Sequence, residues 1–145
     1  MIDLKVAPAG IGYTIFDETL ERPMKSWPQT TKELTALLRN LRGGAPEVMK
    51  AFGAMAQAAT ASKALDGKTK ELIALGIAVA VRCDDCIGFH VKAALEQGAS
   101  QDEVVETLGM AIYMGAGPSV MYASHALEAF AQFKSEKAPR ASPAA

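Results

Sequence analysis

The sequence predicts an all-α protein of about six helices, and three observations lead to this prediction. Apolar residues recur at spacings of three and four along most of the chain, which is the period of one helix face. Half of the residues are apolar but only 6% are aromatic, and much of the apolar content is alanine, the strongest helix former. No segment alternates convincingly between apolar and polar residues, apart from weak strand candidates in the first 16 residues.

Composition divides the chain into three regions. Residues 1–30 hold irregularly spaced prolines and glycines, so we expect an irregular N-terminal arm, with enough apolar side chains to pack on a neighbouring subunit. Residues 31–135 carry the helical pattern and are expected to form one helical domain. Residues 136–145 are rich in proline, alanine and serine, and we expect a flexible tail there.

The first two helices are predicted from stripes of large apolar residues. The first lies within residues 30–44, where leucines recur on one face and Gly43 and Gly44 end the helix. Pro46 suits the first turn of the second helix. The apolar stripe of this second helix consists of Val48, Met49, Phe52, Met55 and Ala56.

The next two helices flank the cysteines. Asp66 can cap a third helix that begins near Lys68. This helix is apolar on almost every side after Glu71, so it should be central and buried. A fourth helix should begin within residues 83–86 and end at Gly98, because glycine favours the backbone conformation of helix ends.

The last two helices are delimited by a cap and by a break. Ser100 and Glu103 have the spacing of a capping box at the start of the fifth helix. Gly115, Gly117 and Pro118 should then interrupt the chain. The sixth helix is expected within residues 119–133.

Length, charge and hydropathy restrict the class of protein. The chain of 145 residues fits one domain, and its net charge of −1 gives no argument for binding nucleic acid or an anionic membrane. The longest apolar run, residues 72–81, is too short to span a bilayer, and the first residues have no signal-peptide pattern. We therefore expect a soluble, cytoplasmic protein, in which a close pair of cysteines is more often catalytic or metal-binding than structural.

The only two cysteines, Cys83 and Cys86, lie in the segment RCDDCIGFH together with His90. The thiolate is the reactive form of cysteine, and a helix start favours an anion because its backbone N–H groups lack partners. His90 follows Cys86 by four residues and therefore shares its helix face, which suits proton transfer from thiol to imidazole. The C-x-x-C spacing also permits the small disulfide ring of dithiol exchange.

Charged residues next to the cysteines oppose one another. Arg82 is a cation that favours a thiolate. Asp84 and Asp85 disfavour a thiolate unless they cap the helix and point away from it. The sequence leaves the sign of the net effect open.

Glu71 can complete a proton relay with His90 if the chain reverses between them. A carboxylate in the most apolar helix of the chain needs a partner. On one straight helix the two residues would be roughly 28 Å apart, at about 1.5 Å per residue. A reversal near Arg82 and Cys83 would form an antiparallel hairpin instead, in which Glu71 can hydrogen-bond His90, fix its tautomer and raise its basicity.

The spacing of these residues resembles a known signature. Glu71, eleven further residues and then Cys83-x-x-Cys86-x-x-x-His90 are similar to the motif of the alkylhydroperoxidase D-like branch of the carboxymuconolactone decarboxylase family. The resemblance covers residues 41–133 and implies a helical bundle around a central helical hairpin, assembled into trimers or hexamers. It also implies reduction of a hydroperoxide substrate by the dithiol, and neither a cofactor nor a metal ion is expected.

The resemblance implies a role for each site residue. Cys86 would attack the peroxide and Cys83 would resolve the resulting sulfenic acid, while His90 and Glu71 assist the deprotonation of Cys86. A protein or small-thiol reductant would then reduce the disulfide. The best-known peroxidases of this branch carry a histidine just before the second cysteine, where this chain has Asp85, so we expect a general thiol oxidoreductase with weaker peroxidase activity.

Other interpretations stay open. Lactone decarboxylation, the reaction of the family's namesake, does not call for two cysteines. A non-enzymatic zinc-binding module would use Cys83, Cys86 and His90, with Glu71 as a possible fourth ligand.

His125 is expected in the core or at an interface. The methionines at positions 110, 114 and 121 form an apolar stripe that suits either a core or the entry for an organic peroxide.

Overall fold

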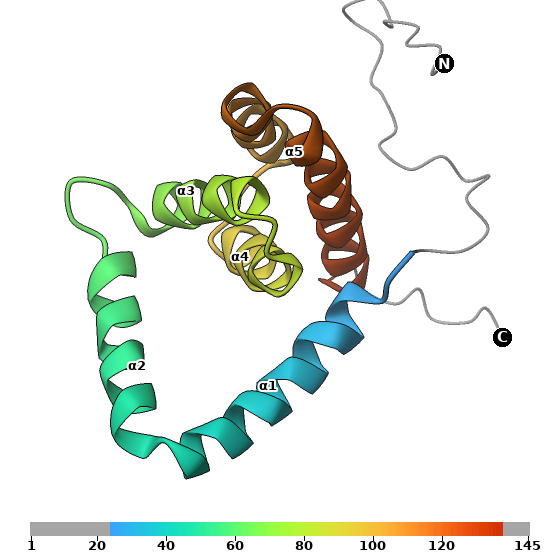
Figure 1. Cartoon of the computed structure of the whole chain (residues 1–145). Coiled ribbons are helices and arrows are strands. Elements are labelled where there is room, and N and C mark those ends of the chain that lie inside the picture. Colours follow the sequence, from blue (N-terminus) through green and yellow to red (C-terminus); the bar gives the residue numbers. More distant parts are fainter. Residues whose placement is uncertain (1–23, 138–145) are drawn as a thin grey trace, which may run out of the picture.

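The computed structural model describes residues 24–137, and this range is entirely helical apart from its connections, as the sequence predicts (Figure 1). Its five helices are α1 (Trp27–Gly44), α2 (Pro46–Thr60), α3 (Gly67–Ala80), α4 (Asp84–Glu96) and α5 (Gln101–Lys137). The weak strand candidates, most of the expected N-terminal arm and most of the expected tail lie outside the described residues. None of the five helices is long and apolar enough to cross a membrane.

The fifth and sixth expected helices are joined as α5, with a kink between them. Ala116 has φ 52° and ψ −147°, so the helical path is interrupted within the segment where the sequence predicts a break. Pro118 follows directly after, and the Ser119 hydroxyl fills the space that a side chain at Gly115 would need. The difference between six expected and five observed helices therefore lies in this one junction.

The predicted helix ends are present. Asp66 caps α3 by accepting a hydrogen bond from the Thr69 N–H at 2.7 Å. At the start of α5, the Glu103 N–H donates to the Ser100 hydroxyl at 3.2 Å and the Ser100 N–H donates to the Glu103 carboxylate at 2.7 Å. Gly98 follows α4 with φ 83°, a conformation that glycine adopts without steric cost.

Helices α3 and α4 form the hairpin on which the expected relay depends. Residues 81–83 connect them, and Arg82 takes the left-handed conformation with φ 61°. The Cys83 N–H donates to the Ala78 carbonyl at 3.0 Å, so the chain reverses tightly. Helix α5 packs against both members of the hairpin, and the core lies among these three helices. Its largest fully buried aliphatic side chains are Leu75, Ile87, Val79, Val91 and Val104.

Helix α1 begins at Trp27, earlier than the expected end of the N-terminal arm at residue 30. Pro28 suits this first turn, where a backbone N–H has no helical partner. The Trp27 N–H donates to Gln132 and its ring Nε1–H donates to Glu128, both at 2.9 Å. These contacts to α5 bury Trp27 to 1% exposure, and only the tertiary structure could place residues 27–30 in the helix.

A glycine allows α1 to approach α4 closely. A Cβ atom at Gly88 would lie 2.9 Å from the Thr31 hydroxyl oxygen and 3.4 Å from the Trp27 ring. Thr31 and Trp27 are themselves buried, so neither can easily give way to a larger residue. The first turns of α4, which follow the cysteines, are therefore held from the α1 side as well as by α3 and α5.

The apolar stripe of α2 is not covered by residues 24–137, the part of the chain that the structure describes. No residue of α2 is buried, and Phe52 is 57% exposed. Within the described residues α2 contacts α1 and α3 but neither α4 nor α5. Figure 1 shows it standing apart from the group formed by α3, α4 and α5.

Candidate functional site

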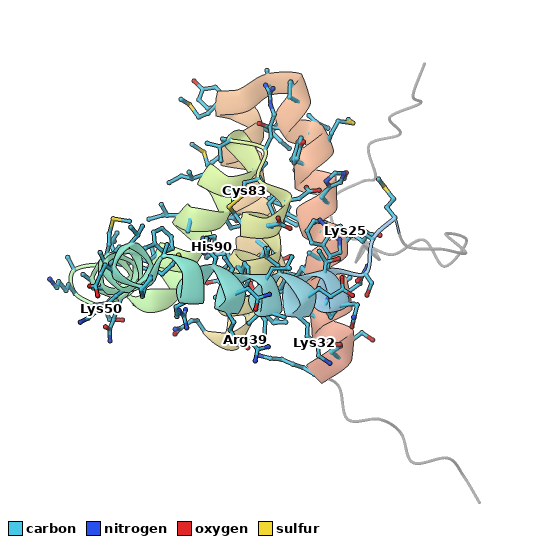
Figure 2. The ribbon with its side chains drawn as sticks, turned by 60° about the horizontal axis from the view of Figure 1, so that its bottom comes forward. Lys25, Lys32, Arg39, Lys50, Cys83 and His90 are labelled. Atoms are coloured by element: carbon cyan, nitrogen blue, oxygen red, sulfur yellow. A yellow bond between two sulfur atoms is a disulfide. The ribbon has the colours of Figure 1, made fainter. Side chains whose placement is uncertain are left out.

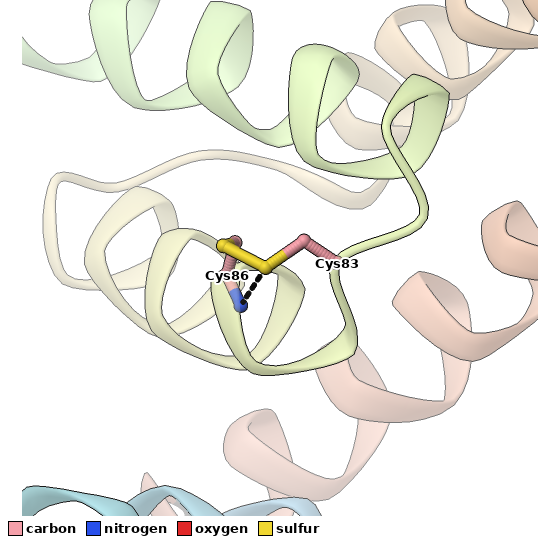
Figure 3. The surroundings of a disulfide bond; sticks show 2 residues. All are labelled: Cys83 and Cys86. Carbon is pink, nitrogen blue, oxygen red and sulfur yellow. Dashed lines mark hydrogen bonds between the residues drawn. A yellow bond between two sulfur atoms is a disulfide. The ribbon is translucent and has the colours of Figure 1, made fainter.

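The two cysteines lie at the start of α4 and are joined by a disulfide bond. Cys83 is the N-cap residue, in an extended conformation, and Cys86 lies in the first turn, with 5.2 Å between the two Cα atoms. The Cys86 N–H donates a hydrogen bond to the Cys83 sulfur at 3.3 Å (Figure 3). A sulfur therefore takes the position that a serine or aspartate oxygen holds in an ordinary helix cap.

This capping contact has a chemical consequence. When the disulfide is reduced, a thiolate on Cys83 would meet the partial positive charge of the helix N-terminus and a backbone donor. Both cysteines are partly exposed, so a small molecule or a partner thiol can reach them. The location that the sequence predicts for the dithiol is confirmed.

Glu71 and His90 are within hydrogen-bond distance, with 2.8 Å between the Glu71 Oε2 and the His90 Nδ1. The reversal at Arg82 brings the start of α3 beside the second turn of α4, so residues far apart in sequence become neighbours. The Glu71 side chain is only 12% exposed, and this contact supplies the partner that a carboxylate in such a position needs. The geometric condition for the relay, a hairpin that joins these two side chains, is confirmed.

The hydrogen bond fixes the orientation of the imidazole. In the tautomer whose Nδ1–H donates to the Glu71 carboxylate, the Nε2 lone pair is the basic site. His90 lies one helical turn after Cys86, so the base and the second cysteine share one face of α4. The side chains of Cys83 and His90 both project from the α4 region in Figure 2.

The two aspartates between the cysteines have different environments. Asp85 is exposed. Asp84 is partly covered, and its carboxylate contacts the His125 Nδ1 at 3.0 Å and the Lys25 Nζ at 3.4 Å. Partial burial raises the pKa of Asp84, but the hydrogen bond to His125 and the charge of Lys25 outweigh this, so the pKa lies below its ordinary value. Asp84 is therefore ionised at neutral pH.

Sequence reasoning missed the part that Lys25 and His125 take in this site. It placed His125 in the core or at an interface, and it assigned Lys25 no role. His125 is half-buried in α5, with its ring 5.2 Å from the Tyr122 ring and 6.2 Å from the Trp27 ring, measured between centroids. No spacing pattern could reveal this contact, because 41 residues separate His125 from Asp84.

The expected methionine stripe lies at the surface. Met110 and Met114 are exposed and line an apolar hollow of about 440 Å³ between α3 and the first half of α5. Ile73 and Ile77 form its α3 side, and Met121 is exposed beyond the kink of α5. Within the described residues no group of three or more His, Cys, Asp or Glu side chains is arranged to hold a metal ion.

Comparisons with known proteins give a consistent result. The sequence profile of the carboxymuconolactone decarboxylase family matches residues 46–129. A carboxymuconolactone decarboxylase family protein from Legionella pneumophila, solved in its apo form, has 52% sequence identity and a TM-score of 0.72, over 74% of this chain and 96% of the other. A family protein from Thermotoga maritima, for which a part in the antioxidative response has been suggested, has 27% identity and a TM-score of 0.69, over 74% of this chain and 92% of the other.

Two uncharacterised proteins from other bacteria are also similar to this chain in sequence. An uncharacterised protein of Cupriavidus necator is 45% identical over 59% of this chain and 75% of its own length. An uncharacterised protein encoded in the cox locus of Paracoccus denitrificans is 38% identical over 66% of this chain and 86% of its own length. Since the family profile spans more than half of the sequence and the folds agree, the chain belongs to the carboxymuconolactone decarboxylase family.

Proposed function

We propose that the chain is a C-x-x-C-dependent thiol oxidoreductase that reduces hydroperoxides in the cytoplasm. The observation that carries the proposal is the 2.8 Å contact between Glu71 and His90, next to a disulfide-bonded cysteine pair. It provides an oriented base on the helix face of Cys86, which is the arrangement that activates a thiol nucleophile. The antioxidative part suggested for the Thermotoga maritima relative supports the same class of reaction.

The reaction can be written so that atoms and electrons balance. The Cys86 thiolate attacks one peroxide oxygen, the O–O bond breaks, and the departing alkoxide takes a proton to become an alcohol. Cys86 is then a sulfenic acid. The Cys83 sulfur attacks the Cys86 sulfur, the S–S bond forms, and the hydroxyl leaves as water after protonation. An external dithiol or two thiol molecules return two electrons and two protons and restore the reduced pair.

The geometry supports different roles for the two sulfurs. Cys86 shares its helix face with His90, so a base is available to remove its proton before it attacks the peroxide. Cys83 caps the helix, so its thiolate is favoured by backbone donors without a side-chain base. A stabilised thiolate at Cys83 suits the attack on a sulfenic acid and also suits its later departure during reduction.

Oxidation of the reduced protein by cumene hydroperoxide tests the proposal. Stopped-flow mixing of the reduced chain with the peroxide should consume one peroxide and two thiols per chain, and dithiothreitol should restore both thiols. The thiols are counted by alkylation and mass measurement. Unchanged thiols after exposure to excess peroxide would rule out the proposed activity.

The same preparation separates the two alternative functions. A zinc-binding module predicts stoichiometric zinc in protein purified without added metal, and its loss on peroxide treatment as the thiolate ligands are oxidised. Lactone decarboxylation predicts release of carbon dioxide from a carboxymuconolactone by a chain in which both cysteines are alkylated. Neither result is expected, because a disulfide joins the two cysteines that zinc would need and because lactone decarboxylation does not call for such a cysteine pair.

We also propose that the chain acts as a homo-oligomer, a trimer or a hexamer, in which a second copy covers the α2 stripe. The stripe consists of Val48, Phe52 and Met55, all exposed and all on one face. An isolated helix of 15 residues is marginal in water, and the contacts of α2 with α1 and α3 bury none of its residues among those the structure describes, so a second copy would supply the missing packing. The apolar hollow beside Met110 and Met114 offers a surface of matching character on the neighbouring copy.

Placing a charge in the α2 stripe should dissociate this oligomer. The protein is expected to sediment as a trimer or hexamer in analytical ultracentrifugation, and Phe52→Glu should shift it to smaller species at concentrations where the unmodified chain is fully assembled. The physical reason is the cost of burying an unpaired carboxylate in an apolar contact.

A matched variant makes this test specific. Gln57→Glu adds the same charge to an exposed position on the opposite side of α2, so it should leave the oligomer intact. A monomeric unmodified protein would refute the proposed assembly, and so would an equal loss of assembly in the two variants.

A further inference from the structure

A second polar network adjoins the dithiol on the side of α5, and the proposed relay does not use it. Asp84 is the first residue of α4 and follows Cys83 directly. Each carboxylate oxygen contacts a different side chain. Oδ1 lies 3.0 Å from the His125 Nδ1, and Oδ2 lies 3.4 Å from the Lys25 Nζ. Glu71 and His90 meet between α3 and α4, so the two networks approach the cysteines from different neighbouring helices.

The second network is built into the fold. Lys25 precedes α1 and lies beside α5, where the Gln132 side chain donates to the Lys25 carbonyl oxygen at 2.8 Å (Figure 2). The Lys25 ammonium also lies 4.3 Å from the centre of the Trp27 ring, a cation–π contact with a buried side chain. Glu128 holds the Trp27 ring from the α5 side. These contacts keep the Lys25 cation close to α4.

The chemistry of the dithiol makes this placement significant. A carboxylate next to Cys83 opposes the thiolate that the helix N-terminus favours. At a helix start Asp84 and the thiolate would also compete for the same backbone donors. A hydrogen-bonding ring at Oδ1 and a lysine ammonium near Oδ2 reduce this opposition, because they offset part of the negative charge and draw the carboxylate toward α5.

We infer that Asp84, His125 and Lys25 form a network that sets the reduction potential of the Cys83–Cys86 pair by neutralising the carboxylate beside Cys83. His125 and Lys25 are positioning residues in this account, because they act through Asp84 and do not touch a substrate. The inference deepens the proposed function, since it concerns the same dithiol, but it requires only that the pair exchanges electrons with thiols.

The direction of each effect follows from the reduction reaction. Two glutathione molecules give two electrons to the disulfide, the S–S bond breaks, and glutathione disulfide forms while the protein gains two thiols. Groups that stabilise a protein thiolate shift this equilibrium toward the reduced protein. Removing the Lys25 charge should therefore favour the disulfide, whereas removing the Asp84 charge should favour the reduced pair.

Equilibrium in glutathione buffers at pH 8 tests this inference on the full chain. We expect Lys25→Met to lower the equilibrium constant for reduction about threefold to tenfold, and Asp84→Asn to raise it by a similar factor, as expected for one charge at close range partly screened by water. Trapping of thiols by alkylation, followed by mass measurement, gives the reduced fraction. Opposite shifts distinguish a charge effect from damage to the fold, which would move both variants in one direction.

Two control variants repeat the same chemical changes elsewhere. Lys134→Met removes another lysine that lies over an aromatic ring, here Phe130, and Asp102→Asn removes an acid from the first turn of α5. Both controls should match the unmodified protein. If Lys25→Met and Asp84→Asn also match it, or if they shift the equilibrium in the same direction, the inference is overturned.

His125 can be examined in the same equilibrium at pH 8. His125→Gln keeps a hydrogen-bond donor for Asp84 and His125→Phe removes it, so His125→Phe should lower the equilibrium constant for reduction more than His125→Gln does. The other titratable groups facing this network are Lys25, Tyr122 and Glu128, and they are retained in both variants. Equal equilibrium constants in these two variants would remove His125 from the network.

The outcomes separate this inference from the proposed function. A pair that equilibrates with glutathione and shows the opposite shifts, but does not react with cumene hydroperoxide, supports the network and refutes peroxide reduction. A pair that reduces the peroxide but has the same equilibrium constant in Lys25→Met and Asp84→Asn supports the proposed function and refutes the network.

Discussion

Replacing Cys86 by serine is expected to abolish the reaction with cumene hydroperoxide, lowering the rate by at least about 10³-fold. Serine has nearly the same shape but a much less acidic and less nucleophilic side chain, so the fold should persist while the attack on the peroxide oxygen fails. Stopped-flow consumption of peroxide by the reduced variant measures this loss. A rate equal to that of the unmodified protein would show that Cys86 is not the nucleophile.

Replacing Cys83 by serine is the matched control for this prediction. This variant retains Cys86 and His90, so it should still consume one peroxide in a single turnover. Without the second sulfur it cannot form the intramolecular disulfide, and Cys86 should accumulate as a sulfenic acid that dimedone traps. If Cys83→Ser loses the reaction and Cys86→Ser retains it, the roles of the two sulfurs are reversed, and the helix-capping thiolate is the nucleophile.

Removing the base is expected to have the next largest effect. His90→Gln should lower the rate of peroxide reduction about 10²- to 10⁴-fold, the range for loss of a general base. Glu71→Gln should have a smaller effect, about 10- to 100-fold, because glutamine can still accept a hydrogen bond but does not stabilise a positive imidazole. The measurement is the rate of thiol loss in the reduced protein at several pH values.

Two exposed positions provide controls for the relay. Lys92→Gln changes an exposed residue of α4 two positions after His90, and Glu106→Gln repeats the acid-to-amide change on α5. Neither should alter the rate. Raising the pH should restore much of the activity of the His90 and Glu71 variants, since hydroxide can then form the thiolate without a base. Variants that stay inactive at high pH would indicate a structural role for the pair rather than proton transfer.

Most of the fold could be predicted from local features of the sequence. The periodic leucines, the Asp66 cap, the capping box at Ser100 and Glu103, and the break before Ser119 depend on neighbouring residues, and all are present. The start of α1 was predicted less well, because Trp27 is anchored by α5 residues about 100 positions away. A helix boundary that depends on contacts with distant residues cannot be predicted from the local sequence.

The candidate site shows the same division between local and remote information. Cys86 and His90 share one helix and Cys83 caps it, so their mutual positions follow from local spacing. Glu71 could be joined to them only on the condition that the chain reverses at Arg82, and that condition is met. The contacts of the Asp84 carboxylate could not be predicted from its neighbours in the sequence, because Lys25 and His125 come from other parts of the chain.

The sequence by itself determined the helical class of the protein, the order of its helices and the identity of the residues at the dithiol. Only the tertiary structure decided that Glu71 meets His90, that Asp84 contacts both His125 and Lys25, and that the described residues leave the stripe of α2 uncovered. The physical reason is that helix periodicity and caps are local properties of the chain. Contacts between helices depend on one or two backbone angles in the connections, such as the positive φ of Arg82.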